Sequence, residues 1–280
     1  MRINPGLVLL LLPLVCLILL FVAPLVNIFG VSFYHYEGVL DYRLPLTLQN
    51  YIHTFQSGTI RSTFLRTGMI ALYSSILAVV ISYPVSYYLS WSTNRRGRAL
   101  VMSAIVFSLF ASTIARGLSW IYILGPQGAA GKISEFLGLG IGSHVLHTEF
   151  SVVVGLTYIA MPFATLTMIS PLQKIRPVIR DAAMMLGASR VETFLYITVP
   201  LSIPGITAAL AVCLTLTLAA FVIPLMLGGG IVDMVSNLIF GRVRETLNFP
   251  LGSAMSMALL CFSIAVMYLS TVATKRLGRA

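Results

Sequence analysis

Residues 170–200 read SPLQKIRPVIRDAAMMLGASRVETFLYITVP, a polar segment that separates two long apolar runs. No charged residue lies between Glu149 and Lys174 on its N-terminal side, or between Glu192 and Asp233 on its C-terminal side. Such runs are long enough to cross the roughly 30 Å hydrocarbon core of a membrane, which takes about 20 mainly apolar residues in a helix. The segment is therefore expected to be a loop at one surface of a membrane protein.

The rest of the chain has the same character. Of its 280 residues, 58% are hydrophobic and only 9% are charged, whereas about a quarter of the residues of a soluble domain are charged. Long intervals with few or no charges predict an all-α membrane protein with six transmembrane helices in a single domain, residues 1–280. The expected spans lie near residues 7–28, 67–89, 99–124, 152–169, 203–227 and 252–272.

The distribution of charge predicts the orientation of the chain. An even number of spans places both termini on one side, and that side also holds the loop 171–200. It carries eleven Lys or Arg residues and two acidic residues, whereas the other side carries six of each. Because cytoplasmic loops are enriched in Lys and Arg, both termini and this loop are expected to be cytoplasmic. The net charge of +10 thus reflects topology and requires no nucleic-acid partner.

Apolar residues at helical spacing predict that the loop begins with an amphipathic helix. The face expected to pack against the protein's own helices consists of Ile175, Val178, Ile179, Ala182 and Leu186. The face expected to dock a partner consists of Asp181, Met184, Met185 and Ala188. Methionine side chains adapt to varied surfaces, which suits such a contact.

Two local signals predict a sharp turn after this helix. Gly187 can adopt the left-handed backbone that ends many helices. Ser189 followed three residues later by Glu192 matches a capping box, which starts a second helix. The loop is therefore expected to form a helix, a glycine turn and another short helix.

The same loop resembles the EAA loop of bacterial ABC importer permeases. Asp181-Ala182-Ala183, Gly187 and Ile197-Thr198-Val199-Pro200 have the spacing of Glu-Ala-Ala, Gly and Ile-x-Leu-Pro in that family, with Asp for Glu and Val for Leu. The resemblance implies a type I ABC importer permease fold with a cytoplasmic coupling helix that contacts an ATP-binding subunit. The implied coupling residues are Asp181, Ala182, Ala183 and Gly187, to which the expected docking face adds Met184 and Met185.

Weaker similarities extend along the chain and resemble the spermidine/putrescine-type branch of these permeases. They comprise Ser32-Phe33, Leu48-Gln49-Asn50-Tyr51, the stretch from Arg116 to Trp120, Leu227-Gly228-Gly229-Gly230, and Asn248 to Ala254. This branch implies a polyamine or similar small organic cation as substrate. Related branches for ferric iron, opines, phosphonates and thiamine share much of the architecture, so those substrates stay open.

The resemblance also implies the assembly in which the chain works. It would lie in the bacterial inner membrane as a multi-pass protein, paired with a second homologous permease. Two ATP-binding subunits, which bind ATP and Mg²⁺, and a periplasmic substrate-binding protein would complete the importer. A secondary carrier or channel is the alternative from another class, for which ionisable residues within the membrane or paired half-helices would be expected.

The chain itself is not expected to be an enzyme. The segment from Gly125 to Lys132 is similar to a phosphate-binding loop, but its glycines are one residue too far apart and Ile133 replaces the Ser or Thr that would hold Mg²⁺. No catalytic cluster accompanies it, and the three cysteines lie in apolar stretches that predict packing roles and no metal site. ATP hydrolysis is therefore expected in a partner subunit.

Arg116 is the single charged residue inside an expected span. Charges within a membrane are costly and often functional, so Arg116 either lines the substrate path or extends to the outer interface. Because no span contains Asp or Glu, an organic cation would need aromatic, hydroxyl or carbonyl groups, or acids at the outer mouth such as Asp233 and Glu245. With Trp120, these residues form the candidate substrate path.

Overall fold

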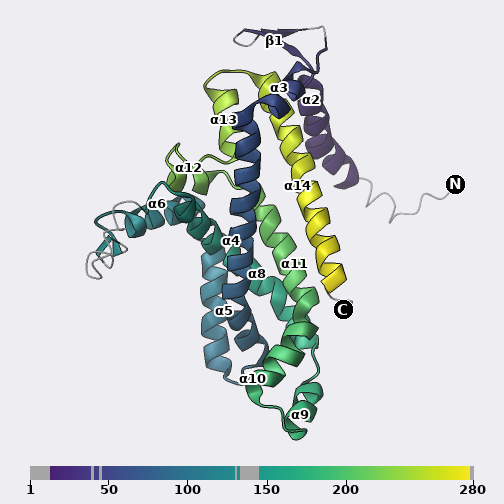
Figure 1. Ribbon diagram of the computed structural model, residues 1–280, viewed down its shortest axis with the longest axis vertical. Coiled ribbons are helices and arrows are strands. Elements are labelled where there is room, and N and C mark those ends of the chain that lie inside the picture. Colours follow the sequence, from purple (N-terminus) through teal and green to yellow (C-terminus); the bar gives the residue numbers. More distant parts are fainter. Residues whose placement is uncertain (1–12, 39–40, 44–45, 130, 133–144, 278–280) are drawn as a thin grey trace, which may run out of the picture. The chain divides into compact units, whose positions relative to one another are not determined.

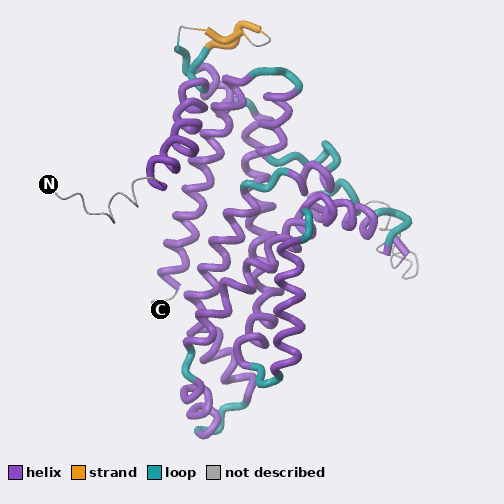
Figure 2. The backbone as a smooth tube through the Cα atoms, turned by 180° about the vertical axis from the view of Figure 1, so that it is seen from behind, coloured by secondary structure: helices purple, strands orange, loops and turns teal. Residues whose placement is uncertain are grey.

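The computed structural model describes residues 13–38, 41–43, 46–129, 131–132 and 145–277. Most of them are helical, and the strands form one hairpin (Figure 2). With η marking π-helical turns, the N-terminal elements are η1 (Ile18–Val22), α2 (Ala23–Val31), β1 (His35–Gly38), β2 (Asp41–Arg43), α3 (Gln49–Gln56) and α4 (Gly58–Trp91). Next come α5 (Arg95–Phe110), α6 (Thr113–Leu124), α8 (Glu149–Lys174), α9 (Pro177–Met185), α10 (Arg190–Thr193) and η2 (Phe194–Thr198). The C-terminal elements are α11 (Val199–Leu218), α12 (Val222–Gly228), α13 (Val235–Arg244) and α14 (Phe249–Leu277).

Among the described residues, five helices are long and apolar enough to cross a membrane, and the bent pair of α5 and α6, counted as one span, makes six. The five are Pro13–Val31, Gly58–Trp91, Glu149–Lys174, Arg190–Leu218 and Phe249–Val272. Each expected span overlaps one of these or the bent pair, although residues 7–12 of the first lie outside the described residues. The expectation of an all-α membrane protein is confirmed, with two spans built differently.

The third expected span, 99–124, was wrong as a continuous helix. α5 ends at Phe110, α6 begins at Thr113, and the two helices meet at an angle of 103° (Figure 1). The backbone of Ala111 and Ser112 is extended between them. A break inside a membrane is tolerated where other groups satisfy the freed carbonyls, and a side chain of α6 does so here.

The fifth expected span, 203–227, was also wrong as one helix. α11 ends at Leu218, and α12 begins at Val222. Pro224 accounts for the interruption, since a proline has no N–H to donate to the carbonyl four residues earlier and clashes with it. In the first turn of α12, where N–H groups have no partner within the helix, the same proline is accommodated.

The described contacts group the chain into two compact units, residues 1–64 with 235–261 and residues 65–234 with 262–280. In the first, the Asn50 side chain donates to the carbonyls of Ser32 and Tyr34, both at 2.9 Å. The hydroxyl oxygens of Ser32 and Tyr51 lie 2.7 Å apart. These bonds join the start of α3 to the end of α2, so two of the quoted similar segments are adjacent in space. The buried core of this unit comprises Ile60, Leu251 and Met255.

In the second unit, a ladder of serines joins α4 to α8. Four hydroxyls of α4 donate to backbone carbonyls of α8, and donor and acceptor are 79 residues apart in every case, so the helices run parallel. The bonds are Ser74 to Val153 at 3.4 Å, Ser82 to Met161 at 2.9 Å, Ser86 to Thr165 at 3.2 Å and Ser90 to Ile169 at 3.4 Å. Small residues at four-residue spacing let two membrane helices approach closely. This pair is the frame against which α11 packs, through a core of Ala160, Ala164, Met168, Ala209 and Cys213.

Candidate coupling site and pathway cavity

α9 has defined ends that follow from its sequence. Pro177 occupies the first position, where a missing N–H costs nothing, and the preceding Arg176 is extended. At the other end Gly187 has φ +94°. Its N–H donates to the Met184 carbonyl, and the Ala188 N–H donates to the Ala183 carbonyl, both at 3.1 Å. This pair of bonds is a Schellman motif, so the predicted left-handed glycine turn is confirmed.

The predicted capping box is confirmed as well. The Ser189 N–H donates to the Glu192 carboxylate at 2.7 Å, and the Glu192 N–H donates to the Ser189 hydroxyl at 3.2 Å. These two bonds, the backbone one first, lower the pKa of the Glu192 carboxyl below its usual value. α10 does not stand alone, because η2 continues it into α11, and Arg190–Leu218 forms one helix of 29 residues.

The expected orientation of α9 was wrong. Ile175 is buried at 6% exposure, but Val178 and Leu186, also expected to face inward, are 65% and 90% exposed. The residue of α9 that packs inward is Ala183, at 9% exposure. Apolar periodicity identifies an amphipathic helix but does not distinguish a face buried in the same chain from one buried by a partner. Here the apolar face points away from the chain.

The exposed apolar side of α9 is a continuous surface. We call it the docking face; its members are Val178, Ile179, Ala182, Met185 and Leu186. A single exposed apolar residue needs no explanation, but a contiguous patch marks an interaction site. Of the expected coupling residues, Asp181, Ala182, Met185 and Gly187 are exposed and Met184 is 39% exposed, whereas Ala183 is buried and offers no free surface.

An aromatic cluster supports the inner side of the loop, and no sequence motif indicates it. The guanidinium carbon of Arg180 lies 4.3 Å from the centre of the Trp91 ring and 5.7 Å from that of Tyr87. Phe194 packs edge-on against Tyr87, at 5.4 Å between ring centres. A cavity of about 330 Å³ lies beside the cluster, lined by Tyr87, Arg180, Met184, Arg190, Thr193 and Phe194.

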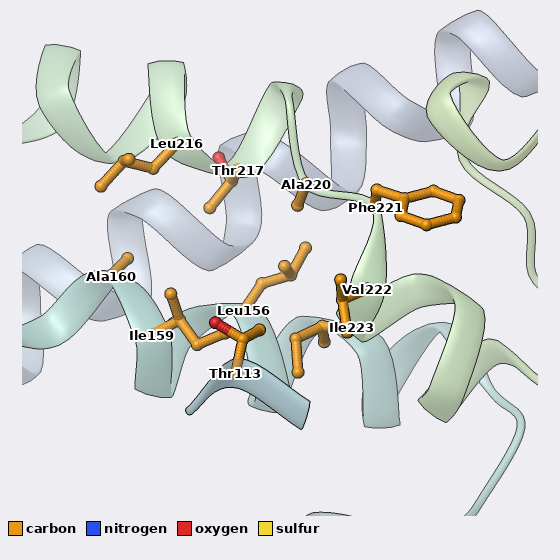
Figure 3. A pocket seen from close by; sticks show the side chains of 10 residues that line it. All are labelled: Thr113, Leu156, Ile159, Ala160, Leu216, Thr217, Ala220, Phe221, Val222 and Ile223. Carbon is orange, nitrogen blue, oxygen red and sulfur yellow. The ribbon is translucent and has the colours of Figure 1, made fainter. Parts of the chain in front are cut away.

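A second cavity, of about 160 Å³, lies at the break between α11 and α12 and is also lined by Thr113, the first residue of α6 (Figure 3). Leu156 projects into it from α8, and Ile223 borders it at the start of α12 (Figure 3). The hydroxyl of Thr217 donates to the Cys213 carbonyl at 2.9 Å. Because its proton is used within α11, the side of the cavity that α11 forms is largely apolar. The lining residues are Thr113, Leu156, Ile159, Ala160, Leu216, Thr217, Ala220, Phe221, Val222 and Ile223. We call this space the pathway cavity.

Arg116 has an arrangement that neither sequence-based alternative described. Its side chain is 8% exposed, and it donates from Nε and Nη2 to the Ala111 carbonyl at 3.1 and 2.6 Å. Nη2 also lies 3.5 Å from the Leu109 carbonyl. The guanidinium therefore caps the C-terminal end of α5, where its positive charge is favourable. It is absent from the lining of the pathway cavity.

The other expected substrate-path residues lie in separate places. Trp120 packs edge-on against Tyr158 at 5.7 Å between ring centres, within an apolar cluster of the second unit. Asp233 belongs to that unit and is half-buried, whereas Glu245 belongs to the first unit and is exposed. None of the three lines the pathway cavity, whose lining consists of aliphatic, Thr and Phe side chains. Uncharged residues of these types do not stand out in a membrane protein sequence.

Residues 6–279 match the family of binding-protein-dependent transport system inner membrane components. The chain belongs to this family. This permease is similar to the spermidine/putrescine transport system permease protein PotB of Haemophilus influenzae, with 27% identity covering 94% of this chain and 92% of that protein. It is 28% identical to the inner membrane ABC transporter permease protein YdcU of Escherichia coli, covering 98% and 91% of the two chains. The molybdenum transport system permease protein ModB of Azotobacter vinelandii is 24% identical over 71% of this permease and 87% of its own length.

Solved structures agree with this assignment at the level of the fold. A chain of a bacterial alginate ABC transporter, in complex with an alginate pentasaccharide-bound periplasmic protein, superposes with a TM-score of 0.79 over 98% of this permease and 95% of that chain. Another structure of an alginate-importing ABC transporter gives a TM-score of 0.77 over 96% of this permease and 95% of that chain. Sequence identity is 16% in both cases. The chain is an ABC importer permease, and the expected fold is confirmed.

Proposed function

We propose that this permease forms half of a translocation pathway together with a second homologous permease, and that α9 is its coupling helix. Two ATP-binding subunits, which hold ATP and Mg²⁺, dock on the cytoplasmic side, and a periplasmic binding protein delivers the substrate. Both termini and the loop 171–200 then lie in the cytoplasm. The observation that carries the proposal is the docking face of α9, an exposed apolar surface on a short helix whose far end is fixed by a Schellman motif.

The continuity of α10, η2 and α11 supports a mechanical connection from this loop to the pathway. The helix Arg190–Leu218 has 29 residues, about 40 Å at 1.5 Å per residue. Its far end contributes Leu216 and Thr217 to the pathway cavity. A displacement that α9 passes to the start of this helix therefore reaches the cavity through one helix. In this scheme ATP binding and hydrolysis switch the pathway between outward-open and inward-open states.

We further propose that the substrate is a polyamine or a similar small organic cation. The names of the PotB relatives support this substrate class. The pathway cavity suits the methylene segments of such a molecule, because its lining is aliphatic apart from Thr113, Thr217 and Phe221. The ammonium groups are left to hydroxyl and backbone carbonyl oxygens, because no charged side chain lines the cavity.

The substrate proposal is tested in the assembled importer. The permease, its partner permease, the ATP-binding subunits and the binding protein are reconstituted in proteoliposomes, and ATP hydrolysis is measured with spermidine, molybdate or a phosphonate. We expect spermidine alone to stimulate hydrolysis. Stimulation by an anion but not by spermidine would overturn the substrate class and leave the permease assignment intact.

A further inference from the structure

α9 depends on contacts outside itself for its position. A helix of nine residues is too short to be stable in water by its own hydrogen bonds. Among its described residues Ala183 is the buried one, and the docking face points away from the chain. The Schellman motif fixes the turn after α9 but not where the helix lies. Its inner side must therefore be held by side-chain contacts. Arg180 makes such contacts from α9, with the rings of Tyr87 and Trp91.

The contact of Arg180 is well suited to holding a helix in place. Tyr87 and Trp91 are four residues apart on α4, and their rings stack at 6.3 Å between centres with 29° between planes. The Arg180 guanidinium lies 4.3 Å above the Trp91 ring. Tryptophan is the best aromatic partner for a cation, and the flat guanidinium stacks on a ring as an ammonium does not. The two rings thus form a platform for one specific side chain.

No other strong interaction is seen for either partner in the described part of the chain. No carboxylate lies within ion-pair distance of Arg180; the ion pair described there joins Arg66 and Glu149. The indole Nε1 of Trp91 is buried without a hydrogen-bond partner among the described residues. No hydrogen bond therefore fixes the Trp91 ring, and its orientation depends on packing and on the Arg180 contact.

The platform is connected to the long helix that reaches the pathway cavity. Phe194, the first residue of η2, packs edge-on against Tyr87 and also against Tyr83, at 5.4 and 5.8 Å between ring centres. The hydroxyl oxygens of Tyr83 and Ser202 lie 2.8 Å apart, which joins α4 to the first part of α11. One cluster therefore contacts α9, α4 and the η2–α11 helix.

The cavity beside the cluster leaves room for a second arrangement. Its volume of about 330 Å³ is bordered by Arg180 and Met184 of α9 and by Thr193 and Phe194 of the adjoining helix. Coupling between distant sites needs an element with two discrete arrangements. Arg180 borders this space directly, and π-helical turns such as η2 are frequent at functional sites.

We propose that Arg180 is a positioning residue for transport, which clamps α9 onto the Trp91–Tyr87 platform so that movement of the docking face is passed to the η2–α11 helix. The inference rests on the proposed role of α9 as coupling helix. Without the clamp, α9 still binds the ATP-binding subunits but moves independently of the bundle. ATP is then hydrolysed with little substrate movement.

The clamp is tested in the complete importer with paired substitutions. Arg180→Gln and Trp91→Leu each remove one partner, Trp91→Phe keeps a ring, and Arg176→Gln is the matched control at an exposed arginine of the same loop. We expect the two disruptive variants to lower substrate uptake per ATP hydrolysed by about threefold to thirtyfold, the range that a cation–π contact supports. For Trp91→Phe we expect an uptake per ATP hydrolysed between that of these variants and that of the wild type. The double variant Arg180→Gln/Trp91→Leu should have an uptake per ATP no lower than that of either single variant.

A second readout follows the contact itself in the full-length permease in nanodiscs, without ATPase. The chain has two tryptophans, so Trp120→Phe leaves Trp91 as its only indole fluorophore. Because Arg180 covers one face of that ring, Arg180→Gln should raise quenching of Trp91 by acrylamide, and Arg176→Gln should not. Unchanged quenching in Arg180→Gln would overturn the clamp.

The outcomes separate the clamp from the proposed function. Loss of coupling in Arg180→Gln but not in Trp91→Leu would mean that Arg180 acts directly on the ATP-binding subunit, and the clamp would be wrong. Normal uptake per ATP in both variants would also overturn it. If charged substitutions on the docking face left ATPase association intact, the coupling role of α9 would fail. The quenching result for Trp91 would still stand.

Discussion

Arg116 stabilises a helix end inside the membrane region, and its removal should be costly. The Ala111 carbonyl accepts two of its N–H groups, and a buried carbonyl left without a donor costs about 1–3 kcal/mol. We expect Arg116→Met to lower the thermal stability of the purified permease. Arg116→Lys, which keeps a positively charged donor, should lower it less than Arg116→Met does. Stability is measured by thermal unfolding in detergent.

The alternative role of Arg116 in substrate binding predicts a different result. Uptake by the correctly folded fraction of Arg116→Met should show the wild-type apparent affinity for substrate, because Arg116 does not line the pathway cavity. Wild-type stability combined with a large change in that affinity would restore Arg116 as a substrate contact.

Gly187 is required by its backbone conformation and not by crowding. Its φ is +94°, and a Cβ built there would meet nothing within 4 Å. A side chain at such a position costs about 1 kcal/mol or more, and β-branched residues cost most. We expect Gly187→Val to weaken co-purification of the ATP-binding subunits or to reduce uptake, and Gly187→Asn to be milder because Asn tolerates positive φ. Equal and normal behaviour of both variants would show that the turn carries no coupling.

At the scale of the element, the docking face is the surface through which α9 should bind its partner. Met185 and Leu186 are each 90% exposed, and an Asp at either position would place an unpaired charge in the apolar contact. We expect Met185→Asp and Leu186→Asp to reduce co-purification of the ATP-binding subunits at least tenfold. Gln173→Glu, which adds a negative charge at an exposed position near the end of α8, is the control. Full co-purification in both Asp variants would place the contact elsewhere.

The coupling loop shows what local sequence signals can and cannot predict. Gly187 and the Ser189–Glu192 pair act through bonds within a few residues, so their geometry was predictable. Which face of α9 turns inward depends on Arg180 meeting Trp91, a residue 89 positions earlier on another helix. Periodicity contains no information about such a pairing. The inward placement expected for Val178, Ile179, Ala182 and Leu186 was therefore wrong, whereas Asp181 and Met185 are exposed as expected.

The breaks in the third and fifth spans also could not be predicted from local sequence signals. Each lies inside a run whose hydrophobicity predicts one membrane crossing, and hydropathy does not report backbone direction. Pro224 marks one break, but Pro162 lies within the continuous α8, so a proline alone does not predict an interruption. The pathway cavity exists because two such breaks meet, and so neither the cavity nor its aliphatic lining could be found from the sequence.

At the scale of the whole molecule, charge distribution predicts that α9 is cytoplasmic. Eleven of the seventeen basic residues outside the expected spans lie on its side. Met185→Cys is tested in a Cys16→Ser/Cys261→Ser background, because these two native cysteines are exposed and Cys213 is buried. In cells that produce the permease without its ATP-binding subunits, we expect a membrane-impermeant thiol reagent to label the Met185→Cys variant only after the cells are permeabilised. Labelling in intact cells would reverse the topology.

The pathway cavity makes a prediction about transport that does not depend on which substrate is carried. Ala220 lines the cavity at the break between α11 and α12, and a tryptophan there would fill much of its 160 Å³. Because Ala220 lies in the break and outside both helices, the larger side chain is not placed on a packed helix face. The expected result is a blocked path in a folded permease.

We therefore expect Ala220→Trp to reduce uptake at least tenfold while the ATP-binding subunits still co-purify. Leu118→Trp is the control, since Leu118 is 57% exposed on the neighbouring α6 and does not line the cavity. Ala220→Leu, with an intermediate volume, should give intermediate uptake if obstruction is the cause. Uptake that falls equally in Leu118→Trp would point to a general disturbance of α6 and α12. Normal uptake in Ala220→Trp, with the variant present in the membrane at the wild-type level, would exclude the cavity from the substrate path and leave the coupling site unaffected.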